Sequence, residues 1–163
     1  MRLRPAAPAD VAFVRAVVQG AENTHYLTDE DDAALNAYAT APASRLLIWE
    51  TDQVTQAGFA LFCGIDDPSG TVELRRLALA QVGMGQGAAF LHVLMDYGFD
   101  SLGAARLWLD VSGENLRAQR VYQQAGFALE GRLRHHRYCR PLGRTVDELL
   151  YGILRDEWMA RRG

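Results

Sequence analysis

The stretch Gly83-Met84-Gly85-Gln86-Gly87-Ala88-Ala89 lies between a predicted strand and a predicted helix. A glycine-rich turn that opens a helix leaves backbone N–H groups free, and these groups bind anions such as phosphates. A second pattern follows downstream, Asn115-x-x-Ala118-x-x-x-Tyr122-x-x-x-Gly126-Phe127. It places Asn115 and Tyr122 two turns apart on one helix, near the same face. Together the two patterns predict a site for a diphosphate-bearing ligand with a proton donor near its far end.

The sequence before the glycine turn predicts a β-hairpin, with strands at 56–65 and 71–79 joined by a tight turn at 66–70. Within 71–79 the apolar parity switches, since Val72 and Leu74 alternate on one face whereas Leu77 and Leu79 fall on the other. Such a switch indicates either a β-bulge near Arg75-Arg76 or a strand that is buried on both faces. The sequence does not choose between these two alternatives.

The remaining chain predicts a mixed α/β fold. We expect one domain over residues 1–163, with a twisted, largely antiparallel sheet, one parallel crossover around the glycine-turn helix, and helices on both faces. The other predicted elements are strands at 2–4, 45–50, 106–111, 127–137 and 145–154, helices from Pro8, from Thr28 as N-cap, at 85–101 and at 115–125, and a loop at 141–143.

Composition excludes several classes of function. The net charge of −3 leaves no basic excess for binding nucleic acid. No apolar run approaches the ~20 residues that span a bilayer, so we expect no membrane segment, and no signal peptide is evident. The two cysteines, Cys63 and Cys139, lie far apart, and no metal-ligand spacing is present. These features predict a cytoplasmic protein without a metal.

With both motifs, the chain resembles the Gcn5-related N-acetyltransferase (GNAT) family over nearly its whole length. The phosphate turn of that family reads Gln/Arg-x-x-Gly-x-Gly/Ala. Gly87 and Ala89 match its two small positions, and Gly85 is a common addition. Met84 departs from the pattern by replacing the first polar residue. The later motif matches at each quoted position.

The resemblance implies that acetyl-CoA is the cosubstrate and that a primary amine is the acceptor. It places the CoA pyrophosphate on the backbone amides of the turn, which comprises Met84, Gly85, Gln86, Gly87, Ala88 and Ala89. The pantetheine arm would pair with the backbone of Leu77, Ala78 and Leu79. Asn115 would hydrogen-bond that arm, and Tyr122 would point at the thioester sulfur as the catalytic acid.

Two carboxylates compete for the role of catalytic base. A free alkyl amine has a pKa of about 10, so a base is required to deprotonate it before attack. Glu73 lies on the strand with the parity switch, and Asp110 ends the next predicted strand. Of the two we favour Glu73, because its longer side chain reaches further into a cleft.

Two alternative functions fit part of the sequence. Residues 83–88 also satisfy the G-x-G-x-x-G/A pattern of dinucleotide folds, with Asp110 where a ribose-binding acid would lie. A hairpin before the turn and a short chain after it argue against a doubly wound sheet. The other alternative is a non-catalytic acyl-CoA-binding module, which Met84 favours and Tyr122 disfavours.

The acceptor is open between a small-molecule amine and a peptide N-terminus. The acidic run 29–32 would attract a cation, but acids in the first turn of a helix account for it without a ligand. Residues 126–134 resemble the branch of the family that includes ribosomal-protein N-terminal acetyltransferases. A homodimer through the C-terminal strands is a further expectation.

Overall fold

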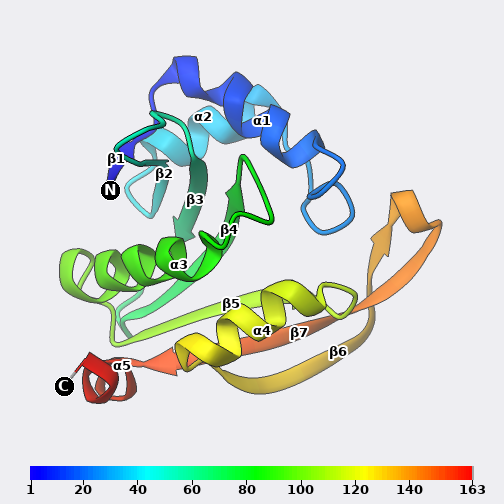
Figure 1. Ribbon diagram of the computed structural model, residues 1–163. Coiled ribbons are helices and arrows are strands. Elements are labelled where there is room, and N and C mark those ends of the chain that lie inside the picture. Colours follow the sequence, from blue (N-terminus) through cyan, green and yellow to red (C-terminus); the bar gives the residue numbers. More distant parts are fainter. Residues whose placement is uncertain (163) are drawn as a thin grey trace.

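The computed structural model describes residues 1–162. It contains a seven-stranded sheet with the order β1-β2-β3-β4-β5-β7-β6 (Figure 1). The strands are β1 (Arg2–Pro5), β2 (Ser44–Glu50), β3 (Gly58–Cys63), β4 (Thr71–Leu79), β5 (Arg106–Ser112), β6 (Ala128–Cys139) and β7 (Arg144–Leu154). Every neighbouring pair is antiparallel except β4 and β5. The predicted mixed sheet with one parallel crossover is confirmed.

Helices cover both faces of the sheet, as the sequence predicts (Figure 1). They are α1 (Val11–Gln19), α2 (Asp32–Thr40), α3 (Gly87–Asp96), α4 (Leu116–Ala125) and α5 (Arg155–Arg162), with short helical turns at Pro8–Asp10, Tyr97–Ser101 and Arg140–Leu142. The apolar faces of α1 and α2 pack with one side of β2 and β3. The apolar faces of α3, α4 and α5 pack with the other side, in the larger cluster.

Local sequence explains where most helices and strands begin and end. The structure corrects two of the expected helix starts. The predicted N-cap of α2 at Thr28 is wrong, because the helix begins at Asp32 and the carboxylate of Asp31 accepts the Ala34 N–H at 2.8 Å. The carboxylate of Asp29 instead forms an ion pair with Arg15 of α1. The predicted start of α3 at residue 85 is also too early, because Gly85 has a φ of +71°, outside the helical region. Helix α5 was not expected from the sequence.

The parity switch in β4 is a β-bulge. Arg76 pairs with Leu61 and Leu74 pairs with Phe62, which leaves Arg75 as the extra residue. After the bulge the side chains change faces, so Leu77 and Leu79 pack toward the same apolar cluster as Val72 and Leu74. Of the two alternatives that the sequence leaves open, the bulge is the one observed.

Within residues 1–162, no helix is long and apolar enough to cross a membrane.

The core under α3 gives a test of the packing. Leu94 on the inner face of α3 is fully buried, whereas Leu116 at the start of α4 is 60% exposed. We expect Leu94→Ala to lower the free energy of unfolding by about 2–5 kcal/mol, because it leaves a cavity, and Leu116→Ala to change it little. Urea unfolding of both variants measures the difference. Equal losses in the two variants would contradict this assignment of the core.

Candidate functional site

A cleft of about 640 Å³ opens where β4 and β5 separate. The two parallel strands pair only at Thr71–Glu73 with Arg106–Trp108, and beyond these residues each leaves an edge that no strand within 1–162 covers. The cleft is lined by residues 23 and 26–28 after α1, 74–79 of β4, Val82, Gly83, 85–88 and Phe90 of the turn and α3, 110–112 of β5, Asn115, Arg117, Ala118, Val121, Tyr122 and Gln124 around α4, His136 and Arg137 of β6, and Glu148 of β7.

The glycine turn forms one end of the cleft. Gly83 and Gly85 have φ angles of +84° and +71°, which glycine adopts without the steric cost of a side chain. The first internal hydrogen bond of α3 runs from the Phe90 N–H to the Gln86 carbonyl at 2.9 Å. The N–H groups of residues 86–89 therefore donate to no carbonyl within residues 1–162. Together with the helix dipole, they form a site for an anionic group.

The predicted residues of this turn are not placed alike. Gly85, Gln86, Gly87 and Ala88 line the cleft, whereas Met84 and Ala89 do not. Met84 is 67% exposed and is not part of the cleft lining, where its polar counterpart in the family pattern would serve.

The backbone of β4 forms one wall. Leu77, Ala78 and Leu79 pair with β3 through one edge of the strand, and their other edge faces the cleft. Because main-chain groups of a strand point alternately to its two edges, part of this backbone is free to bond an extended ligand. The three residues thus lie where the sequence analysis places the cofactor arm.

Helix α4 supplies Asn115 and Tyr122. Asn115 is the N-cap, since its side-chain oxygen accepts the Ala118 N–H at 3.1 Å, and its residue also borders the cleft. Tyr122 is buried, yet its hydroxyl has no hydrogen-bond partner within residues 1–162. Burial, with a smaller contribution from the charge of Asp110, raises the pKa of Tyr122, so the phenol keeps its proton at neutral pH.

Asp110 and Glu73 differ in their position and in their ion-pair partners. Asp110 lines the cleft, and no Arg, Lys or His of residues 1–162 forms an ion pair with it. Loss of hydration and the charge of Glu73 raise the pKa of Asp110. Glu73 does not line the cleft, and its carboxylate accepts both Nη2 and Nε of Arg75, at 2.8 and 3.0 Å. The structure therefore brings Asp110, and not Glu73, to the cleft with Tyr122.

The cleft passes through the sheet. Leu107, Leu109 and Val111 belong to the cluster beneath α3 and α4, so Asp110 projects from the opposite face of β5. Tyr122 reaches the cleft from the α4 side. The separation of β4 and β5 is what allows an acid from one face and a phenol from the other to line one cavity.

Several residues of the cleft are not predicted by the sequence. Glu148 is a buried acid on β7, and its parity with Val146 and Leu150 was the one signal that could have revealed it. Arg137 pairs with it across the sheet. His136 lines the cleft because β6 bulges between Leu133 and Arg137. No pattern in the local sequence predicts this bulge.

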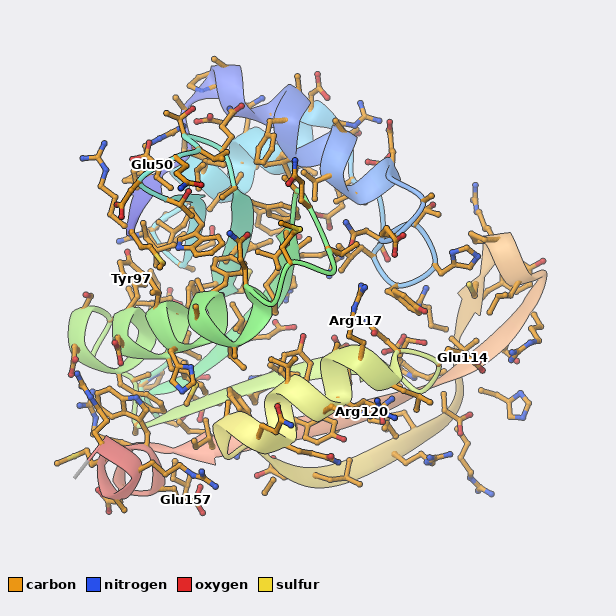
Figure 2. The ribbon with its side chains drawn as sticks, viewed as in Figure 1. Glu50, Tyr97, Glu114, Arg117, Arg120 and Glu157 are labelled. Atoms are coloured by element: carbon orange, nitrogen blue, oxygen red, sulfur yellow. The ribbon has the colours of Figure 1, made fainter. Side chains whose placement is uncertain are left out.

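The loop after α1 lies over the part of the cleft that β6 lines. Its His25 carbonyl accepts Nη2 of Arg137 at 3.3 Å and the Sγ–H of Cys139 at 3.5 Å. Glu22 of the same loop lies 3.8 Å from Arg117, which Figure 2 shows near the start of α4. The β6–β7 hairpin rises toward this loop in Figure 1. Within residues 1–162, no group of His, Cys, Asp and Glu side chains is placed to hold a metal ion.

The family follows from comparison with known proteins. Residues 14–127 match the model of the acetyltransferase (GNAT) family. The chain belongs to this family. An uncharacterized N-acetyltransferase of Mycobacterium bovis is 35% identical over 128 residues, covering 77% of this chain and 72% of the relative. The spermidine N(1)-acetyltransferase of Escherichia coli K12 is 28% identical over 148 residues, covering 83% of this chain and 76% of the relative.

Solved structures show the same fold. The spermidine N-acetyltransferase of Vibrio cholerae, in complex with CoA and spermine, superposes with a TM-score of 0.86 at 23% identity, covering 97% of each chain. The expectation of a GNAT N-acetyltransferase that uses acetyl-CoA is confirmed at the level of the family. The dinucleotide alternative is wrong, because the sheet has a single parallel pair rather than a doubly wound order.

The raised pKa of Asp110 predicts a cost in stability. A carboxylate whose folded pKa exceeds its unfolded value destabilises the fold increasingly as the pH rises through the two values. We expect Asp110→Asn to raise the free energy of unfolding at pH 7, with a gain that shrinks as the pH falls toward about 4, the unfolded value. Asp66→Asn, at an exposed turn, serves as the matched control. An unchanged stability of Asp110→Asn at pH 7 would show that this carboxylate keeps its hydration.

Proposed function

We propose that this protein transfers the acetyl group of acetyl-CoA to a primary amine of a small molecule by direct attack. The single observation that carries the proposal is the cleft itself, which joins the free amides of the glycine turn, the free edge of β4 and the Tyr122 hydroxyl in one continuous cavity.

Different residues of the cleft would hold different parts of acetyl-CoA. The N–H groups of residues 86–89 would hold the pyrophosphate, with Gly85 allowing the backbone to approach closely. Leu77, Ala78 and Leu79 would bond the pantetheine arm through their free edge. Asn115 would bond the same arm through its amide N–H₂, because its oxygen is committed to the helix cap. Met84 adds no side-chain contact, so backbone groups carry the phosphate site.

The cofactor supplies an activated thioester. Asp110 takes the proton of the acceptor ammonium, directly or through a water molecule, because it is the carboxylate in the cleft that has no ion-pair partner within residues 1–162. The amine nitrogen then bonds the acetyl carbon, and the carbon–sulfur bond breaks. Tyr122 donates its phenolic proton to the departing sulfur, and the second proton that the nitrogen loses returns to the phenolate.

This assignment replaces our preference for Glu73. The guanidinium of Arg75 binds the Glu73 carboxylate and lowers its availability as a base. Glu73 remains near enough to Asp110 to raise the pKa of that group, so its role is to set the charge around Asp110.

The proton donor gives the primary test. We expect Tyr122→Phe to lower kcat by about 10²–10⁴ while acetyl-CoA binding is kept, because the phenol acts in the chemical step. Turnover with an amine panel and calorimetric titration with acetyl-CoA measure the two quantities. Tyr97→Phe is the matched control, because Tyr97 does not line the cleft and follows the C-terminal end of α3, away from the glycine turn. A wild type that binds acetyl-CoA but acetylates no amine would favour the non-catalytic module, and binding of NAD in its place would overturn the proposal.

The base gives a second test. We expect Asp110→Asn to lower kcat/KM by about 10²–10⁴ at neutral pH and to remove the lower ionisation from its pH profile. Glu73→Gln should keep that ionisation and shift it to lower pH, because the charge that raises the pKa of Asp110 is gone. The opposite result, with the ionisation lost in Glu73→Gln and kept in Asp110→Asn, would return the role of base to Glu73.

The remaining expectations extend this proposal. A polyamine, named for the relatives of E. coli and V. cholerae, and a peptide N-terminus both offer a primary amine. The ribosomal-protein branch stays a prediction. So does the homodimer, for which β6 offers an exposed edge strand with Leu129 and Leu133 on its surface.

A further inference from the structure

The acids around the acceptor end of the cleft are already neutralised. Glu73 is bound by Arg75 at 2.8 Å, and Glu148 by Arg137. Glu30, beside the cleft, lies 3.6 Å from Arg76. The lining itself carries four arginines against two acids, as Arg75, Arg76, Arg117 and Arg137 face Asp110 and Glu148. A polycation would therefore meet one unpaired carboxylate, that of Asp110.

The guanidinium of Arg76 makes few hydrogen bonds, although its side chain is only 20% exposed. Its Nη1 donates to the Arg75 carbonyl at 3.2 Å, and its buried Nε has no partner within residues 1–162. Its contact with Glu30 is longer than a hydrogen bond. That Nε has no exposed surface, but Arg76 lines the cleft, so the positive charge of its guanidinium acts on an anionic group bound there.

The guanidinium of Arg137 also has a nitrogen that donates no hydrogen bond within residues 1–162. Its Nε donates to Glu148 and its Nη2 to the His25 carbonyl at 3.3 Å, which leaves Nη1 without a partner within residues 1–162. The N–H groups of this one nitrogen donate charge-assisted hydrogen bonds to a carboxylate.

The free carboxylate shares the cleft with these two arginines, and its strand lies between theirs in the sheet order. Loss of hydration and the charge of Glu73 raise the pKa of Asp110, and the charges of Arg76 and Arg137 act against them. Arg76 comes from β4, Asp110 from β5 and Arg137 from β6, and all three line the cleft. One negative site flanked by two positive sites is complementary to a molecule whose ammonium and carboxylate lie close together.

We propose that the acceptor is a zwitterionic amino acid, whose ammonium binds Asp110 and whose carboxylate binds Arg76 and Arg137. This inference rests on the proposed acetyl transfer and narrows its acceptor. A polyamine lacks the carboxylate, and a peptide N-terminus carries none beside its amine. The product is then an N-acetylated amino acid and free CoA, with the first amine proton taken by Asp110, the thiol proton given by Tyr122 and the second amine proton returned to Tyr122.

The test compares acceptors that differ in charge alone. The standard L-amino acids are assayed beside their amides and their decarboxylated amines, with spermidine as the polycation. We expect kcat/KM for the preferred amino acid to exceed that of its amide by at least tenfold. Arg76→Gln should raise KM for the amino acid about tenfold, leave KM for the amide unchanged and so remove the preference. Arg120→Gln, on the exposed face of α4 in Figure 2, should change neither.

Activity on the amide shows that Arg76→Gln is folded, and its melting temperature gives a second check. Equal or better use of the amide, the decarboxylated amine or spermidine would overturn the zwitterionic acceptor while leaving acetyl transfer intact. Loss of activity on every acceptor in Arg76→Gln, with an unchanged melting temperature, would also overturn it, because the arginine would then serve more than the carboxylate. A wild type that neither binds acetyl-CoA nor acetylates any amine would overturn the proposed function itself, and this inference with it.

Discussion

The separation of β4 from β5 is the constraint on which the site depends. The two strands pair at Thr71–Glu73 and then diverge, because β4 stays paired with β3 on its other side while β5 continues along β7. Two separate apolar clusters, one under α1 and α2 and one under α3 and α4, hold the sheet while it opens. Unpaired strand edges normally invite association, but here they line a cavity that suits an extended ligand.

The opening also brings together groups that a continuous sheet would keep apart. Alternation along β5 puts Asp110 on the face opposite to the cluster that contains Tyr122. In a closed sheet the acid and the phenol would never share a cavity. The β-bulge at Arg75 contributes on the other side, because it turns Arg76 toward the face of Asp110 while Leu77 and Leu79 keep their apolar contacts.

Charge pairing distinguishes the carboxylates of the site more sharply than their positions do. Glu73 and Glu148 each have an arginine within hydrogen-bond distance, whereas Asp110 has none within residues 1–162. Loss of hydration raises the pKa of Asp110 although the residue stays exposed, and perturbed carboxylates of this kind are concentrated at active sites. In our proposal, the arginines that line the cleft with Asp110 make its acceptor end selective for charge.

The sequence alone determined the parts whose signals are local. The glycine turn, the helix that begins after it, the parity switch of β4 and the order of the strands all show in neighbouring residues, and all were found in the structure. Only the tertiary structure decided which carboxylate enters the cleft, because Glu73 and Asp110 look alike until Arg75 is seen to bind one of them. Arg76, Arg137, His136 and Glu148 come from three strands that meet only through the sheet order, and the bulge that exposes His136 has no counterpart in the local sequence. Contacts between strands distant in the chain set these positions, so the chemistry of the acceptor end follows from the fold and not from any motif.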